Sequence, residues 1–244
     1  MPVKTPPAPS PTTAEEVRAV LIRMGDPARA GLSLRFFKTG PGQYGEGDKF
    51  LGLSTPQLRA LGKTYHLLPL DQIDILLTDE FHDVRSLALM LMVERYRKGD
   101  GAERERVFAA YLRRLDFVNN WDLVDGSAPY IVGPHLKDRD RSLLDELIAS
   151  PVMWRRRVAV LATLHFIRAG ELAPTLDFCD RLLGDRQDLM HKACGWMLRE
   201  AMKRDRKLVE DWLIARAGRV PRTALRYAIE RLPPERRQWH MALR

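Results

Sequence analysis

The sequence predicts an all-α protein, a curved solenoid built from antiparallel helix pairs. From Ser54 to Leu232 almost every segment has apolar residues at helical spacing, and no run alternates as a strand would. Four of these segments resemble one another, each with a basic residue at or near its start: 84–91, 156–163, 191–198 and 221–228. Arg85, Trp121, Arg157 and Lys192 recur with a period of about 35 residues, which is typical of stacked helix pairs, whose inner helices line one wall.

The predicted elements begin after a proline-rich segment, residues 1–12, which we expect to form a disordered tail. Thr13 and Glu16 have the spacing of a capping box and open an amphipathic helix. A stretch with four glycines follows, residues 39–48; it lacks the Gly-Lys-Ser/Thr ending of a phosphate-binding loop, so we expect a flexible connection that orders on a ligand. Ser54 then caps a helix with Pro56 at its first position.

Helix breaks are predicted at glycines and prolines further along the chain. They fall at Pro69, Gly99–Gly101, Gly133–Pro134, Pro151, Gly170, Gly184 and Gly218. We expect residues 13–232 to form one domain and residues 233–244 to form a C-terminal tail.

Composition excludes several classes of protein. Of the 244 residues, 45% are hydrophobic and 30% are charged, which argues against wholesale disorder. No apolar run approaches 18 residues, so we expect no membrane span, and without a signal or transit peptide we expect a cytoplasmic protein. The six histidines lack metal-ligand spacing and are expected to be structural or solvated, and Cys179 and Cys194 to be buried free thiols.

Positive charge is concentrated in the C-terminal part of the chain. The net charge is +8, but residues 151–244 alone carry 20 basic and 11 acidic side chains, a net +9. A basic balance confined to one part of a folded chain favours a polyanion-binding protein, although many basic proteins bind no nucleic acid.

The segment 119–125 carries the most suggestive chemistry. Asn120 is placed to cap a helix, on which Trp121 and Asp125, four residues apart, share one face. Asp122 points elsewhere, toward the helix dipole. The alternative interpretation is a core tryptophan beside a surface aspartate.

The spacing of the repeat places further residues on the same wall. Arg85, Trp121, Arg157 and Lys192 are separated by 36, 36 and 35 residues. The segment 154–157, which includes Arg156, starts one inner helix, and the segment 192–199, with Trp196 and Arg199, forms another. Each tryptophan alone fits a core position, but tryptophans, an aspartate and basic residues in register indicate a binding groove.

Five motifs together resemble the AlkD family of DNA alkylation repair glycosylases: 36–40, 44–52, 118–125, 154–157 and 192–200. The likeness runs from about Thr13 to Leu232. It implies a solenoid of HEAT-like repeats with a basic concave face for duplex DNA. It also implies a monomer that excises cationic N3- and N7-alkylated purines without metal or cofactor and without flipping the base.

The resemblance assigns roles to individual residues. Trp121 and Asp125 match the family's tryptophan and catalytic aspartate, and Trp196 matches its second site tryptophan. Arg157 matches an arginine that holds the DNA backbone, and Tyr44 falls near a DNA-contacting tyrosine. We expect Lys192, Arg199 and Arg156 to bind DNA as well. Two alternatives remain: a non-catalytic DNA-binding repeat protein and a protein-binding helical scaffold.

Overall fold

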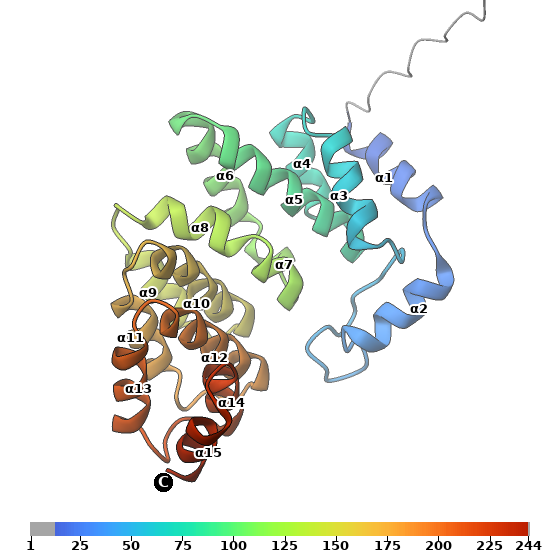
Figure 1. The fold of residues 1–244 in the computed structure, drawn as a ribbon. Coiled ribbons are helices and arrows are strands. Elements are labelled where there is room, and N and C mark those ends of the chain that lie inside the picture. The colour runs from blue at the N-terminus through green and yellow to red at the C-terminus, as the bar shows by residue number, and fades with distance from the viewer. Residues whose placement is uncertain (1–12, 244) are drawn as a thin grey trace, which may run out of the picture. The chain divides into compact units, whose positions relative to one another are not determined.

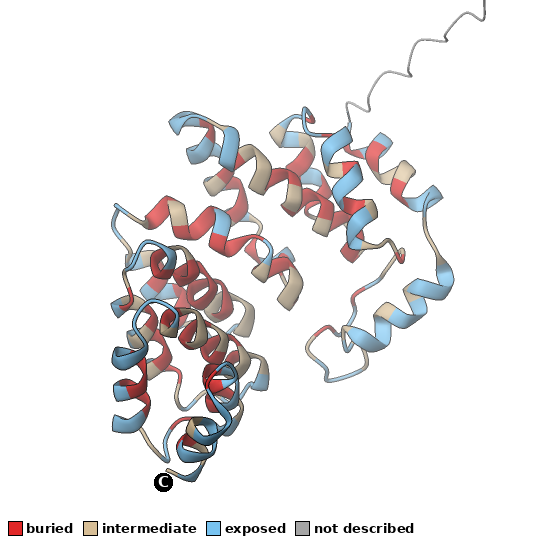
Figure 2. Ribbon diagram, in the orientation of Figure 1, coloured by how far each residue is buried: buried red, intermediate tan, exposed pale blue. Residues whose placement is uncertain are grey.

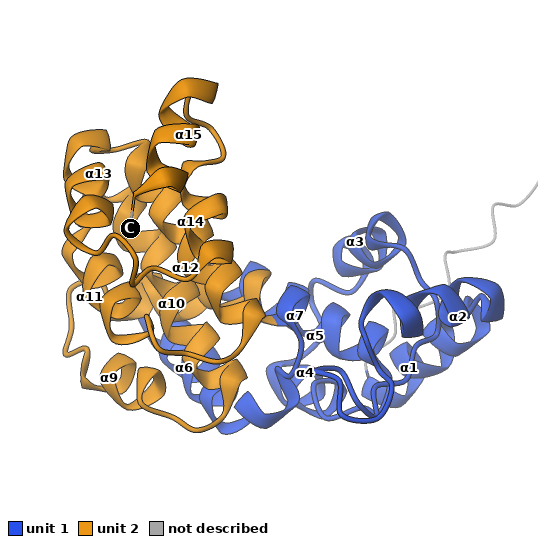
Figure 3. Ribbon diagram, turned by 90° about the horizontal axis from the view of Figure 1, so that it is seen from below, with its two compact units in different colours: residues 1–123 blue, residues 124–244 orange. Residues whose placement is uncertain are grey.

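The computed structural model describes residues 13–243, so the proline-rich segment 1–12 lies outside the described residues. Over the described range the chain forms fifteen α-helices and no β-strand, which confirms the all-α prediction (Figure 1). No helix in this range is long and apolar enough to cross a membrane. The chain divides after Leu123 into two compact units (Figure 3).

The first unit is organised around α5, its longest helix. Its elements are α1 (Ala14–Arg23), α2 (Pro27–Phe36), α3 (Thr55–Thr64), α4 (Leu70–Leu76), α5 (His82–Lys98), α6 (Gly101–Arg113), the 3-10 turn Leu115–Phe117, and the start of α7 (Trp121–Asp125). Helices α1, α3, α4 and α6 all pack on α5. The buried core includes Leu21 of α1, Ile73 of α4 and Leu87 of α5.

Helix α2 is the exception in this unit because none of its residues is buried (Figure 2). Its N-terminus is capped by Asp26, whose side chain accepts hydrogen bonds from the Ala28 and Arg29 amides. Its apolar residues nevertheless face solvent, with Leu32 59% exposed and Phe36 63% exposed. Helix α2 is therefore stabilised by its cap and its ends rather than by packing along its length.

The residues directly after the glycine-rich segment, 49–53, are hydrogen-bonded to the start of α5. The Asp83 carboxylate, at the start of α5, accepts hydrogen bonds from the amides of Leu51 and Leu53 at 2.7 and 2.8 Å. Lys49 pairs with Phe81 in an isolated β-bridge. Buried acceptors on α5 thus satisfy the loop backbone, which takes the place of regular secondary structure.

The second unit stacks its long helices in sequence order. Its elements are α8 (Ala128–Leu136), α9 (Ser142–Ile148), α10 (Met153–Arg168), α11 (Ala173–Arg181), α12 (Asp188–Met202), α13 (Arg206–Ala215), α14 (Arg222–Ile229) and α15 (Pro234–Ala242). Helix α10 packs on α8 and α12, and α12 packs on α14, while α9, α11 and α13 pack against these helices as a second layer. Figure 2 shows the buried positions gathered along α10 and α12.

Two glycines let the stacked helices approach closely. A Cβ at Gly133 of α8 would overlap the Ala162 carbonyl of α10, and a Cβ at Gly195 of α12 would overlap the Ala224 carbonyl of α14. The predicted break at Gly133–Pro134 is therefore wrong, because both residues lie inside α8, where the glycine is a packing residue and the proline falls in the last turn.

Local signals at other helix ends are confirmed. The capping box of Thr13 and Glu16 opens α1, and Ser54 caps α3, with Pro56 at its second rather than first position. Both cysteines are buried free thiols. The segment expected as a C-terminal tail instead contains α15, because His240 and Arg236 anchor it to Glu210 of α13.

Candidate functional site

The short helix α7 carries the two residues on which the sequence prediction centres. It begins at Trp121 in the first unit and ends at Asp125, the second residue of the second unit. Because the two are four residues apart in one helix, they share a face. Asn120 precedes the helix as predicted: its side-chain oxygen accepts from the Trp121 amide at 2.9 Å, and it is completely buried.

In the second unit, Asp125 is clamped by Arg157 from the first turn of α10. The guanidinium donates from Nε to Oδ1 and from Nη2 to Oδ2, both at 2.8 Å, which forms a two-pronged pair. Its Nη1 donates to the Leu189 carbonyl at the start of α12, at 2.7 Å. Arg157 therefore ties the carboxylate of Asp125 to two helices of this unit.

The exposures of the two side chains show what the pair can do. The Arg157 side chain is 5% exposed, whereas that of Asp125 is 17% exposed. A guanidinium stays charged at all physiological pH values, and its rigid fork fixes the plane of the carboxylate. The result is an oriented, partly exposed anionic group, which can stabilise positive charge that develops next to it.

The other basic residues predicted for binding are partly engaged within the second unit. Arg156 donates to Asp185 at 2.8 Å, and Lys192 pairs with Asp188 at 2.9 Å. Arg199 pairs with Glu230. Lys192 keeps the most exposed side chain of the three, at 38%. Asp188 and Glu230 are exposed, so a phosphate can replace them as partners of Lys192 and Arg199, whereas the side chain of Asp185, the partner of Arg156, is only 4% exposed.

The aromatic candidates lie in separate units. Trp196 is a half-buried residue of α12, the helix whose first turn is hydrogen-bonded to Arg157. Tyr44 lies in the glycine-rich loop of the first unit, where its hydroxyl donates to the Phe36 carbonyl at 3.4 Å. Asp125 and Arg157 contact each other in the second unit, whereas Tyr44 lies in a loop of the first unit.

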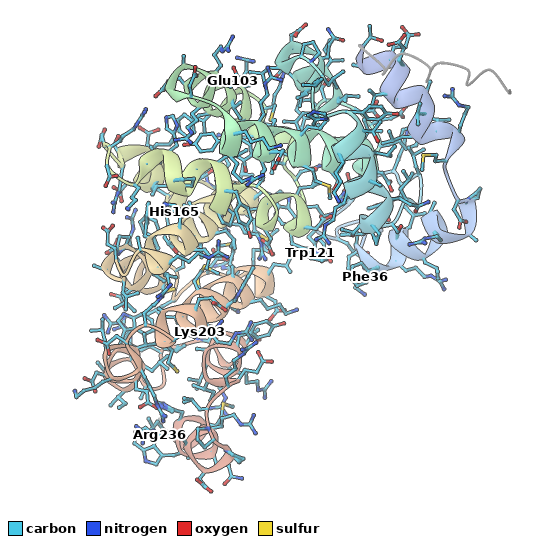
Figure 4. The ribbon with its side chains drawn as sticks, turned by 45° about the horizontal axis from the view of Figure 1, so that its top comes forward. Phe36, Glu103, Trp121, His165, Lys203 and Arg236 are labelled. Atoms are coloured by element: carbon cyan, nitrogen blue, oxygen red, sulfur yellow. The ribbon has the colours of Figure 1, made fainter. Side chains whose placement is uncertain are left out.

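Trp121 belongs to an aromatic cluster in the first unit. Its ring stacks on Phe37 at 5.5 Å between centroids and meets Phe36 edge-on at 5.8 Å. Figure 4 shows Trp121 and Phe36 on neighbouring segments. Phe37 in turn stacks on Phe50 at 5.0 Å. Trp121 is therefore held from one side by residues of α2 and the loop that follows it.

A buried polar network lies behind this cluster. His82, 3% exposed at the start of α5, has Nδ1 3.1 Å from Asp48 Oδ2 and Nε2 2.8 Å from Asp122 Oδ2. Arg85 donates to Asp48 and Asn119, and Asn120 donates to Asp48 at 3.1 Å. The network joins the glycine-rich loop, α5 and the first turn of α7.

Ionisation in this network follows from its contacts. Burial disfavours charge on His82, but hydrogen bonds to Asp122 and Asp48 outweigh it and raise the His82 pKa to about 9. Burial likewise opposes ionisation of Asp48, yet the hydrogen bond from His82 and the charge of Arg85 lower its pKa. At neutral pH the network therefore contains charged His82 and Arg85 facing charged Asp48.

Sequence reasoning missed this network. It assigned Asp122 only to the helix dipole and treated His82 as structural or solvated, because 34 residues separate His82 from Asp48 and 40 separate it from Asp122. No local periodicity connects such positions. The available signal was indirect, since Asp48 and Asn120 both fall within motifs that carry the family resemblance.

No metal site appears in the part of the chain that the structure describes, since no three His, Cys, Asp or Glu side chains gather to ligate an ion. Fold and site together define an all-helical protein with an oriented carboxylate and a basic C-terminal half.

Comparison with known proteins places this class in a family. Residues 17–232 match the family described as DNA alkylation repair enzyme, so the chain belongs to that family. A solved structure from Enterococcus faecalis, described as a predicted DNA alkylation repair enzyme, has the same fold: it is 20% identical, with a TM-score of 0.66, over 86% of this chain and 97% of its own. No curated protein shows significant sequence similarity to the chain.

Proposed function

We propose that this protein is a monofunctional DNA glycosylase that excises cationic N3- and N7-alkylated purines from duplex DNA. The family supports DNA alkylation repair. The observation that carries the finer proposal is the Asp125 carboxylate, which the Arg157 guanidinium orients and which stays partly exposed. That arrangement suits a reaction in which the substrate develops positive charge.

The proposed reaction is hydrolysis of the N-glycosidic bond. The alkylated purine is already a cation, so it leaves with the bonding electron pair as a neutral base and needs no general acid. Positive charge then develops on the deoxyribose, in an oxocarbenium-like state that Asp125 stabilises. Water adds at the sugar carbon and loses a proton to solvent, which leaves an abasic site.

Trp121 and Trp196 are proposed to pack on the sugar and to attract its developing charge through their ring faces. The lesion stays in the base stack, as the family resemblance implies, so the enzyme contacts the sugar and backbone rather than a flipped base. No lysine is assigned to Schiff-base formation, so we propose base release without strand cleavage.

DNA binding is proposed to depend on phosphate contacts. Lys192 and Arg199 would exchange their carboxylate partners for phosphates, with Arg156 and Tyr44 as further contacts. Arg157 has five N–H donors, of which Asp125 and Leu189 account for three. We expect Lys192→Ala to weaken binding equally for unrelated duplexes and to lower the salt slope by about one ion.

Base release tests the proposal directly. The assay incubates purified protein with a duplex that contains one N7-methylguanine and measures the free base, with Asp125→Asn beside the wild type. Release by the wild type and loss in the variant would support the proposal. Tight duplex binding without release would favour the non-catalytic DNA-binding alternative, and release by both proteins would refute the role of Asp125.

A further inference from the structure

We propose that His82 is a positioning residue for this reaction: held between Asp48 and Asp122, its imidazolium ring sets the place of Trp121 on α7. The inference rests on the proposed function, in which Trp121 contacts the sugar. His82 itself is buried and acts through its neighbours. The family resemblance assigns no role to His82, which lies in the first unit together with Trp121.

The geometry requires a charged ring. Both ring nitrogens of His82 lie within hydrogen-bond distance of a carboxylate oxygen, at 3.1 Å for Asp48 and 2.8 Å for Asp122. A neutral imidazole has one N–H and can donate to only one of them, and its other nitrogen would face an anion with a lone pair. Only the imidazolium satisfies both carboxylates.

Three connections lead from this ring to Trp121. Asp122 follows Trp121 directly in α7, so the hydrogen bond from His82 fixes the first turn of that helix. Asp48 accepts from Asn120, whose side-chain oxygen accepts from the Trp121 amide. The His82 ring also lies 4.9 Å from the Phe37 ring, on whose surface Trp121 stacks. Backbone, polar and aromatic contacts therefore converge on the same indole.

Among the described residues, no other charged group that faces the His82 ring can replace its positive charge. The charged groups that face the ring are Asp48 from the loop, Asp122 from α7 and, across Asp48, Arg85 of its own helix. Among the described residues, Asp122 Oδ1 is buried without a hydrogen-bond partner, so Asp122 already depends on His82. When His82 loses its proton, the ring can donate to only one carboxylate. Buried Asp48 keeps Arg85 and Asn120 as donors, whereas Asp122, whose side chain is 26% exposed, can turn toward water, so we expect the hydrogen bond to Asp122 to break.

The first test follows Trp121 itself and needs no substrate. The Trp121 indole signal, assigned by NMR with Trp121→Phe, is recorded from pH 6 to pH 10. We expect it to shift with a midpoint near the His82 pKa of about 9, and to lose this transition in His82→Gln. The matched control is His66→Gln, which changes an exposed histidine of the same unit and should leave the transition unchanged.

The second test asks whether excision follows the same transition. Single-turnover base release is measured at saturating protein over the same pH range, with release from duplex alone subtracted. We expect the rate to fall with rising pH, with the same midpoint as the Trp121 signal. At pH 7, His82→Gln should release the base up to about 100-fold more slowly than the wild type, because a misplaced catalytic contact can lower a rate by that factor. Its affinity for the duplex should be unchanged.

The outcomes separate the two hypotheses. A wild-type rate that stays constant through the Trp121 transition, or a Trp121 signal that does not titrate, would overturn the positioning role. If His82→Gln fails to fold, these two wild-type profiles still decide. If the wild type releases no base while Trp121 still titrates with His82, the proposed function has failed and the structural coupling has not.

Discussion

The two units hold their buried charges in different ways. In the first, a histidine between two carboxylates joins a loop to two helices. In the second, Arg157 of α10 forms a bidentate ion pair with Asp125 of α7 and donates a hydrogen bond to the Leu189 carbonyl of α12. The network of the first unit includes Asp122, and the pair of the second unit includes Asp125.

The two units differ in whether the cation that binds the carboxylates can lose its proton. The cation of the first unit can lose its proton near pH 9, whereas a guanidinium cannot do so in a protein. The second unit therefore keeps its carboxylate oriented at every working pH, while the position of Trp121 in the first unit depends on protonation. The orientation of the Asp125 carboxylate therefore does not depend on the proton of its cation, whereas the proposed positioning of Trp121 does.

The largest expected effect comes from Asp125→Asn. The variant keeps the shape and removes the charge, so excision should fall by about 100- to 1000-fold, or roughly 2.7–4 kcal/mol of transition-state stabilisation. Duplex affinity should hold or rise, because Arg157 loses its competing carboxylate. Single-turnover release at saturating protein measures the rate, and salt titration measures the affinity.

A matched control for this variant is Asp211→Asn, which changes an exposed acid of the same unit paired with Lys207. It should leave excision unchanged. Because Arg157 is buried, unfolding in urea must first show that Asp125→Asn is folded under the assay conditions. A folded Asp125→Asn protein with the wild-type rate would remove the second unit's pair from the mechanism.

Alkaline pH should weaken the first unit selectively. The His82 pKa is about 9 in the folded protein against 6.5 ordinarily, so its stabilising contribution is complete below pH 6.5, declines as pH rises and is lost above about pH 9. The shift corresponds to about 3 kcal/mol at 1.36 kcal/mol per unit. Hydrogen exchange at pH 6 and pH 9.5 should show α5 losing protection, and His82→Gln should remove the difference.

The second unit should respond in the opposite direction. Burial opposes ionisation of Glu210, but hydrogen bonds from Arg236 and His240 outweigh it and lower the Glu210 pKa to about 2. Its contribution is therefore complete above pH 4.5 and is lost as pH falls through about 2. Loss of α15 protection at alkaline rather than acidic pH would contradict this assignment.

A smaller effect is expected from a substitution where two helices of the second unit pack closely. Gly195→Ala would push a methyl group into the Ala224 carbonyl of α14, and we expect it to destabilise the second unit by about 1–3 kcal/mol. The measurement is the urea midpoint at constant slope. An unchanged midpoint would show that α12 and α14 can separate without cost.

The smallest effect should have the opposite sign. Gly62, inside α3 of the first unit, has only the tip of Leu87 near its missing Cβ, at 3.8 Å. Gly62→Ala should therefore stabilise the protein by about 0.4–1 kcal/mol, because alanine loses less conformational freedom in a helix. If Gly62→Ala destabilises the protein, the space next to Gly62 does not accommodate a methyl group, and the contrast with Gly195 fails.

Local rules predicted most of the fold. Helical periodicity and the caps at Thr13 and Ser54 depend on neighbours within one turn, so they can be read directly from sequence. Gly133 and the segment that forms α15 were misread because their conformations depend on distant partners, Ala162 of α10 and Glu210 of α13. Tertiary contacts there override the local signals.

In the candidate site, too, local spacing was predictable and contacts between distant segments were not. Trp121 and Asp125 were predictable because they are four residues apart in one helix, and Arg157 because the repeat spacing and the resemblance both point to it. The ion pair that Arg157 forms with Asp125 was not predicted, nor was the network of His82, since both join segments that are more than 30 residues apart. The candidate residues could be proposed from the sequence, whereas their hydrogen-bond partners became known only from the structure.

Helix α2, which buries none of its residues, has a practical consequence for handling the protein. A helix without packing along its length opens at little free-energy cost, which exposes its backbone to proteases. Arg29 and Arg35 lie on its exposed surface, so within residues 13–243 trypsin should cut the native chain there first. Helix α1 would stay attached through buried Val17 and Leu21, which makes α2 a natural point at which to split the protein into two associating fragments.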